Sequence, residues 1–163
     1  MIIAGSTAVT SYALLNDRAV VITRVLNASR ALVFDVWTNP THVPNWLTGP
    51  DGWTMPVCEI DLRPGGRWKF VYRKEGGVEM TMGGSYLEVM PPERVVSTES
   101  WGPEWPETVN SLVFTESAGR TTATITITYP SAEARDAALK TGMKEGMDQS
   151  FARLDAELAS LAN

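Results

Sequence analysis

The sequence is poor in the side chains on which covalent cross-links and many metal or catalytic sites depend. Its 163 residues include one cysteine, Cys58, and one histidine, His42. A lone cysteine excludes an intramolecular disulfide and a cysteine-based metal cluster, and it suits a reducing compartment. We therefore expect a cytoplasmic protein that needs neither a metal nor another cofactor.

Concentrated positive charge and long apolar runs are also missing. The 14 basic and 19 acidic side chains give a net charge of −5, and no segment gathers Lys and Arg as nucleic-acid binding requires. The N-terminal segment MIIAGSTAVTSYALL has no basic residue and is interrupted by polar ones, which is unlike a signal peptide. No run approaches the length of a transmembrane helix. We expect neither a nucleic-acid partner nor insertion into a membrane.

The length predicts one domain. A chain of 163 residues buries a sizeable core without metals or disulfides. Residues 19–27 are rich in β-branched side chains, which is typical of a strand. We expect an N-terminal extension over residues 1–17 and a single domain over residues 18–163.

Two short helices are predicted after the first strand. Ser29 is a suitable N-cap for the first helix, whose apolar residues fall on one face. Asn39-Pro40 ends this helix, because the residue before a proline is disfavoured in the α conformation. The second helix is expected over residues 41–47.

From there to residue 129, apolar and polar side chains alternate, which predicts six strands separated by turns. Gly83-Gly84 suggests a bend or bulge within one long strand. In the last strand, threonines alternate with apolar residues such as Ile125 and Ile127. One buried and one solvated face is the pattern of an antiparallel sheet.

The C-terminal segment is predicted to be helical, with Ser131 as its N-cap. Gly142 and Gly146 lie four positions apart in this segment, and each costs roughly 1 kcal/mol relative to alanine in a helix. We expect them to allow close packing or to leave room for a ligand; alternatively, Gly142 marks a break between a short helix, 132–140, and a long one. The long helix carries one apolar stripe, because its apolar residues recur every three or four positions: Met143, Met147, Phe151, Leu154, Leu158 and Leu161. An antiparallel sheet covered by such a helix is an α+β fold, and a curved sheet would leave an apolar space beneath the helix.

Four segments within residues 18–161 form a familiar set: VITRVLNASRALVFDVWTNPTHVPNWLTGPDGW, CEIDLRPGGRWKF, GSYLEVMPPERVV and YPSAEARDAALKTGMKEGMDQSFARL. Together they resemble the activator of heat-shock protein 90 ATPase homologue family, in the START-like or SRPBCC superfamily. The resemblance implies the helix-grip fold of the birch-pollen allergen: a curved seven-stranded antiparallel sheet around a long C-terminal helix, with two short helices between strands 1 and 2 and a hydrophobic cavity.

Three functions are compatible with this resemblance. The first is a non-catalytic carrier or sensor of a small hydrophobic molecule, as is presumed for single-domain members. The second is a cyclase- or hydrolase-type enzyme that uses a carboxylate or tyrosine in the cavity. The third is a chaperone-associated module. The co-chaperone that names the family contacts its chaperone through a separate N-terminal domain, and a 17-residue extension is too short to be one. The sequence is also compatible with a homodimer.

We expect a set of aromatic and sulfur-containing side chains to line the cavity. Methionine adapts to varied apolar shapes, although methionine and tryptophan in these positions are equally suited to fill a core. Both interpretations apply to Trp46 and Trp53, which we expect at one end of the space. The predicted cavity residues are Trp46, Trp53, Met55, Phe70, Tyr72, Met80, Met82, Trp101, Met143, Met147 and Phe151.

No catalytic residue is assigned. Glu88 and Glu99 are the carboxylates, and Tyr86 the hydroxyl, that would support chemistry if they faced the cavity; otherwise they are solvated strand residues. His42 lies close to the prolines that end one helix and begin the next, and the sequence shows no activated Ser or Cys near it. We therefore predict an exposed or capping histidine without catalytic partners. The segment WGPEWPE, residues 101–107, suggests a lid or a protein-contact patch.

Overall fold

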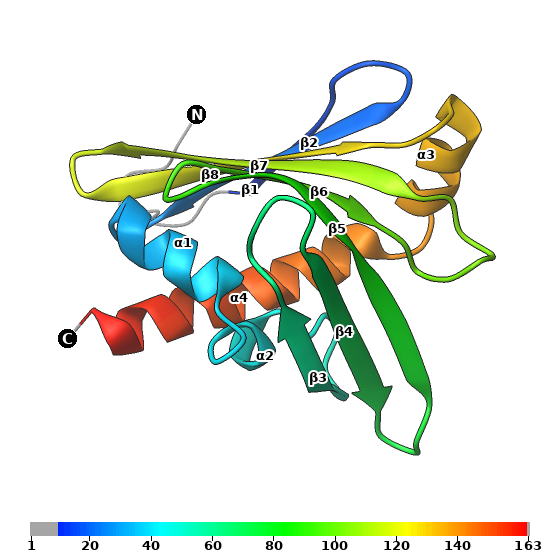
Figure 1. Cartoon of the computed structure of the whole chain (residues 1–163), viewed down its shortest axis with the longest axis horizontal. Coiled ribbons are helices and arrows are strands. Elements are labelled where there is room, and N and C mark those ends of the chain that lie inside the picture. The colour runs from blue at the N-terminus through cyan, green and yellow to red at the C-terminus, as the bar shows by residue number, and fades with distance from the viewer. Residues whose placement is uncertain (1–9, 163) are drawn as a thin grey trace.

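A computed structural model describes residues 10–162, in which one antiparallel sheet lies over a long helix (Figure 1). The sheet has eight strands in the order β1-β2-β8-β7-β6-β5-β4-β3. The elements are β1 (Thr10–Leu14), β2 (Ala19–Leu26), α1 (Arg30–Thr38), α2 (Val43–Trp46), β3 (Trp53–Ile60), β4 (Arg67–Lys74), β5 (Glu79–Met90), β6 (Arg94–Glu99), β7 (Thr108–Ser117), β8 (Arg120–Thr128), α3 (Ala132–Leu139) and α4 (Met143–Leu161).

This arrangement confirms the predicted α+β helix-grip fold and corrects the number of strands from seven to eight. The additional strand is β1, an edge strand that forms an antiparallel hairpin with β2. It belongs to the segment predicted as an extension, and Tyr12 ties it to the helix by donating from Oη to Asp148 Oδ1 at 2.7 Å. The first nine residues of that segment lie outside the described part of the chain.

Three local signals in the sequence act as predicted at the ends of helices. Ser29 Oγ accepts a hydrogen bond from the Leu32 backbone N at 3.4 Å, which caps α1. Ser131 Oγ accepts one from Ala134 N at 3.1 Å, which caps α3. Gly142 has a φ of 80°, in the left-handed region that glycine tolerates, and separates α3 from α4. Local chemistry therefore sets where these helices begin.

The predicted bend in the long strand β5 is where the sheet divides. The first half of β5 pairs with β4 as far as Ser85, and the second half pairs with β6 from Tyr86 onward. A Cβ atom on Gly84 would lie 1.9 Å from the Thr98 carbonyl oxygen, so only glycine permits this approach. Figure 1 shows the result: β3, β4 and the part of β5 beside β4 run steeply across the direction of β2, β7 and β8.

The solid core lies between the sheet, α1, α2 and the C-terminal half of α4. Phe151, Leu154 and Leu158 of α4 are 0–3% exposed. Trp46 is fully enclosed, and its Nε1 donates to the Val36 carbonyl oxygen at 3.0 Å. Full burial of a side chain of this size stabilises the fold by roughly 1.5–3 kcal/mol, so this region holds the helix against the sheet.

Arg24 of β2 adds a polar link beneath the same helix. Its guanidinium pairs with Asp155 of α4, donates to Thr10 Oγ1 of β1, and lies 5.3 Å from the centre of the Phe151 ring. A buried cation is tolerated when it is paired in this way.

No helix within residues 10–162 combines the length and the apolar character needed to cross a membrane.

Candidate ligand-binding pocket

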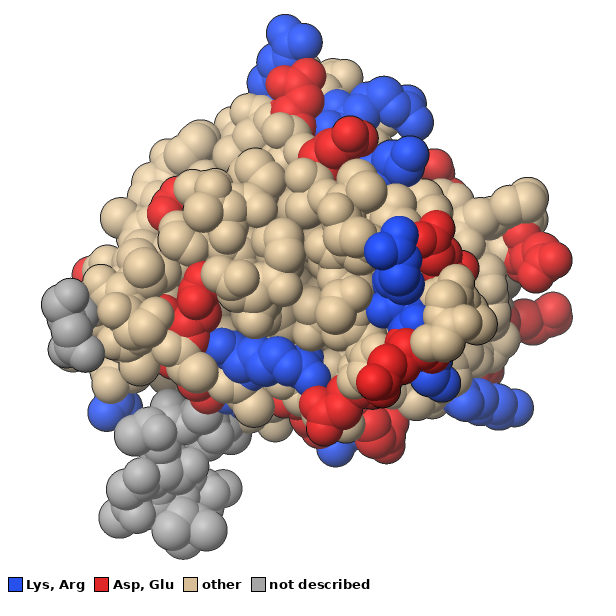
Figure 2. Space-filling view, turned by 90° about the horizontal axis from the view of Figure 1, so that it is seen from below, with Lys and Arg blue, Asp and Glu red and all other residues tan. Residues whose placement is uncertain are grey.

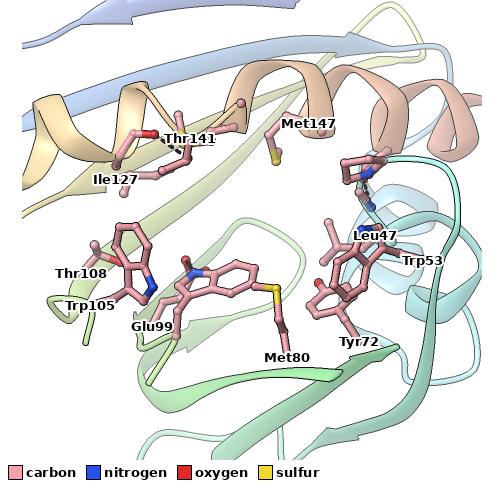
Figure 3. Close-up of a pocket in the computed structure, with 18 of the residues that line it drawn as sticks. Leu47, Trp53, Tyr72, Met80, Glu99, Trp105, Thr108, Ile127, Thr141 and Met147 are labelled. Atoms are coloured by element: carbon pink, nitrogen blue, oxygen red, sulfur yellow. Dashed lines mark hydrogen bonds between the residues drawn. The ribbon is translucent and has the colours of Figure 1, made fainter. Parts of the chain in front are cut away.

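A cavity of about 420 Å³ lies at the opposite end of the sheet, beneath α3 and the N-terminal half of α4. Figure 3 shows Met147 projecting from α4 into this space, across from Met80 and Tyr72 on the sheet. The wall is completed by the loop before β3, by the ends of β6 to β8 and by the loop after β6. The lining residues are Leu47, Thr48, Gly49, Pro50, Trp53, Tyr72, Met80, Glu99, Trp101, Trp105, Pro106, Thr108, Ile127, Tyr129, Ala134, Ala138, Thr141, Gly142, Met143, Gly146, Met147 and Ser150.

The pocket is apolar and open to solvent. Trp101 and Trp105, on the loop after β6, are 37% and 46% exposed, and Met80 is 41% exposed. The rings of Tyr72 and Trp101 stack with their centres 6.0 Å apart and their planes at 10°. A concave surface of exposed aromatic and sulfur-containing side chains is typical of a binding site for a small molecule.

Glu99 is the one carboxylate among the described lining residues, and its orientation is fixed by two donors. Trp101 Nε1 donates to Oε2 at 2.8 Å, and Asn110 Nδ2 donates to Oε1 at 3.0 Å. Thr108 Oγ1 in turn donates to Asn110 Oδ1 at 3.1 Å. Burial raises the pKa of Glu99 above its ordinary value, and the bonds from Trp101 and Asn110 offset part of that rise.

Two tyrosines add hydroxyl groups to the same wall. Burial raises the pKa of Tyr72 and of Tyr129, and the negative charge of Glu99 raises both further. Both phenols are therefore protonated at neutral pH and act as hydrogen-bond donors. The Tyr129 hydroxyl already donates to the Met143 sulfur at 3.7 Å.

The structure divides the predicted cavity residues between the pocket and the core. Those that line the pocket are Trp53, Tyr72, Met80, Trp101, Met143 and Met147. The others are at most 7% exposed and belong to the packed core: Trp46, Met55, Phe70, Met82 and Phe151.

The physical reasons for the core placements differ. Trp46 is enclosed at the far end, where α1 and α2 fill the space under the sheet, and Phe151 lies two turns along α4 from Met143. Phe70 and Met82 are paired across β4 and β5, and the Phe70 ring lies 4.8 Å from that of Trp68. Phe70 and Met82 therefore lie outside the lining of the pocket beneath α3 and α4.

Of the three candidates for chemistry, only Glu99 lines the pocket. Glu88 is exposed, and its Oε2 accepts from Arg94 Nε at 2.9 Å, as a solvated pair on neighbouring strands. Tyr86 is buried away from the pocket lining, and burial raises the pKa of its phenol. Of these three candidates, only Glu99 therefore meets the condition of facing the cavity.

Sequence reasoning missed several lining residues. Trp105 lies in the segment predicted as a lid, so its composition had already marked it. Tyr129 continues the inward-facing positions of β8, a signal that the alternation contains. Ala134 and Ala138 of α3 carry no such signal, because alanine fits any helix and only the fold shows what these two residues face.

His42 is neither the exposed nor the capping histidine that the sequence predicted. Its side chain is 17% exposed, its Nδ1 lies 3.1 Å from Glu157 Oε2, and its Nε2 lies 3.5 Å from Asp35 Oδ2. It stands before α2 without capping it and joins α1 to α4. The prediction failed because Glu157 lies 115 residues away in the chain.

Nowhere in residues 10–162 do three His, Cys, Asp or Glu side chains form a group able to hold a metal.

Charge on the surface is mixed in sign. Figure 2, which views the molecule from below, shows basic and acidic side chains interspersed around an uncharged central area. This face therefore offers no single-sign field of the kind that attracts a polyanion such as nucleic acid.

Comparison with known proteins agrees with the architecture. Residues 27–159 match the family described as activator of Hsp90 ATPase homolog 1-like protein. A solved structure of a protein from Rhodobacter sphaeroides is 25% identical with a TM-score of 0.87, and the match covers 93% of this chain and 99% of that chain. A solved structure of a protein from Mycobacterium smegmatis is 26% identical with a TM-score of 0.81, and the match covers 91% of this chain and 96% of that chain.

An AHSA1-like protein from Aeromonas hydrophila shares the fold at 18% identity and a TM-score of 0.69, with 83% of this chain and 92% of that chain covered. No curated protein shows significant similarity. The family match spans most of the chain and confirms the resemblance drawn from the sequence segments. This chain therefore belongs to the family of activator of Hsp90 ATPase homolog 1-like proteins.

Proposed function

We propose that this protein binds a small, mainly apolar molecule in the pocket beneath α3 and α4, as a carrier or sensor and not as an enzyme. The observation that carries the proposal is the pocket itself, a cavity of about 420 Å³ with walls of aromatic and sulfur-containing side chains. This volume falls in the range of small-molecule sites. The exposed rings of Trp101 and Trp105 supply the apolar surface that a ligand would cover.

The energetics favour a ligand that is largely apolar. Every 100 Å² of apolar surface removed from water contributes about 2.5 kcal/mol. Two of the hydroxyl groups on the wall are already engaged in hydrogen bonds within the protein. Ser150 Oγ accepts from Gly49 N at 2.9 Å, and Thr141 Oγ1 donates to the Ala138 carbonyl oxygen at 2.7 Å.

The test uses N-phenyl-1-naphthylamine, an uncharged probe that fluoresces strongly in apolar surroundings. Ala138 lines the pocket from α3, whereas the neighbouring Ala137 is exposed. Ala138→Trp should fill the pocket and weaken probe binding by at least about tenfold. Ala137→Trp, which adds the same ring to the other face of the same helix, should bind the probe as the wild type does.

The proposal is overturned if the wild type gives no saturable rise in fluorescence, or if both tryptophan variants bind equally well. Thermal unfolding of each variant shows whether it is folded. Because wild-type binding is measured first, a poorly folded Ala138→Trp does not leave the result undecided.

A second candidate, acid–base catalysis, is favoured by one observation: Glu99, whose pKa is raised, lies within electrostatic reach of the protonated Tyr72 and Tyr129 phenols. No hydroxyl of the described lining is held by a base in the manner of an activated nucleophile. Hydrolysis of 4-nitrophenyl butyrate that is lost in Glu99→Gln would support catalysis, and equal background rates would count against it. The chaperone contact implied by the family name stays a prediction.

A further inference from the structure

The chemistry of the ligand can be narrowed further, on the assumption that the proposed apolar pocket is real. Glu99 is the only charged side chain among the described residues that line it; Lys, Arg and His are missing from that lining. A pocket built for a fatty acid or another anion would be expected to offer a cation. This one offers a carboxylate, so its electrostatics exclude an anionic head group.

Glu99 has no ionic partner among the described residues, unlike several other carboxylates of this protein. Glu79, Glu88 and Glu157 pair with Arg73, Arg94 and His42. None of the ion pairs found within residues 10–162 includes Glu99.

The two hydrogen bonds to Glu99 leave room for a third donor. A carboxylate has about four lone-pair sites, and Trp101 Nε1 and Asn110 Nδ2 occupy one on each oxygen. These donors hold the carboxylate in place, so a ligand meets it without a cost for ordering the side chain.

The aromatic walls favour a cation next to this carboxylate. The faces of Trp and Tyr rings attract cations through their π electrons. Trp105 and Tyr129 line the pocket together with the stacked pair Tyr72 and Trp101. Trp53 also lines it, but Lys74 Nζ already lies 5.9 Å from the centre of its ring. Figure 3 shows Trp105 beside Glu99, with Trp53 and Tyr72 across the space.

We propose that the pocket selects a ligand with an apolar body and a protonated amine. The ammonium group donates to Glu99 and lies among the aromatic rings, while the apolar body extends along Met80, Met143 and Met147. Burial raises the pKa of Glu99, and an ammonium group beside it would favour the ionised carboxylate.

The test is displacement of N-phenyl-1-naphthylamine near neutral pH by three probes that differ only in the head group: 4-phenylbutylamine, 4-phenylbutan-1-ol and 4-phenylbutanoate. The amine should displace the fluorophore at a concentration at least about tenfold lower than the alcohol, and the carboxylate should be weakest. In Glu99→Gln the preference for the amine over the alcohol should fall to within about twofold.

Glu88→Gln is the matched control. It removes the same charge from an exposed pair with Arg94, outside the pocket lining, and should keep the wild-type preference. A preference that falls equally in both variants would mean that net charge, not Glu99, sets the selectivity, which overturns the proposal.

The two proposals fail in different ways. If the fluorophore binds but the amine does not outcompete the alcohol, or if the carboxylate is preferred, the ligand class is wrong and the apolar pocket stands. If the fluorophore does not bind the wild type at all, the proposed function fails and this inference fails with it. The wild-type ranking decides even if Glu99→Gln is unstable.

Discussion

The two halves of α4 have the same apolar periodicity and opposite surroundings. In the C-terminal half, Phe151, Leu154 and Leu158 are 0–3% exposed. In the N-terminal half, Met143 and Met147 continue the same stripe but border the pocket and are partly exposed. The helix therefore stabilises the fold with one half and supplies a wall of the candidate site with the other.

The difference comes from what lies opposite the helix. At the C-terminal end, α1 and α2 fill the concave side of the sheet, and the Trp37 ring reaches within 6.1 Å of the Phe151 ring. At the N-terminal end, α3 presents only Ala134 and Ala138, which leave the space open. A binding site can therefore arise without any change in the helix pattern, when the neighbouring element carries small side chains.

The largest expected effect separates the two halves by truncation. Phe151→Ala should lower the free energy of unfolding by about 3–5 kcal/mol, because it leaves a cavity in the solid core. Met147→Ala should cost only about 1 kcal/mol, because its side chain already borders an open space and few contacts are lost. Urea denaturation measures both values. Equal losses would show that the two halves are packed alike.

The next effect uses the two glycines near the start of α4, whose substitutions should act in opposite directions. Gly142→Ala should destabilise by about 1 kcal/mol, because its φ of 80° is strained for alanine. Gly146→Ala should stabilise by up to about 1 kcal/mol through helix propensity. The new Cβ would lie 3.5 Å from Pro50 Cδ, an ordinary contact. Thermal unfolding measures the pair, and shifts of the same sign would contradict this account.

The smallest effect is the pH dependence that Glu99 gives to the pocket end. Its pKa is raised in the folded state, so its contribution to stability is complete below its ordinary value of 4.5 and is lost as pH rises through the folded pKa. Glu99→Gln should therefore gain stability relative to the wild type as pH rises. One pKa unit corresponds to about 1.4 kcal/mol, so the size of this gain measures how far the pKa of Glu99 is raised. The measurement is the urea midpoint of the wild type and of Glu99→Gln at a series of pH values. A difference between the two midpoints that stays constant as pH rises would contradict this prediction.

Much of the fold could be predicted because its signals are local. Ser29, Ser131 and Gly142 set helix ends through their own hydrogen bonds or backbone angles, and the stripe of α4 follows from its spacing. The edge strand β1 was missed because its five residues were grouped with the unpatterned N-terminal segment.

The site was predictable only in part, because its geometry depends on contacts between distant segments. The apolar stripe of α4 predicts which of its residues face the sheet. Which part of the space between α4 and the sheet is filled by other side chains depends on the positions of α1, α2 and α3. Glu88 and Glu99 were equivalent in the sequence. The register shift between Tyr86 and Glu88 in the β5–β6 pairing is invisible in the alternation, so the sequence could not show that only Glu99 reaches the pocket.

The most direct test of the central claim is nuclear magnetic resonance of the methionine methyl groups during titration with N-phenyl-1-naphthylamine. The probe's rings should shift the methyl signals of the pocket residues Met80, Met143 and Met147 in a saturable way. Signals from methionines outside the pocket should stay in place, namely those of Met55, Met82 and Met90. Unchanged signals from the pocket methionines, or shifts confined to the others, would contradict the account.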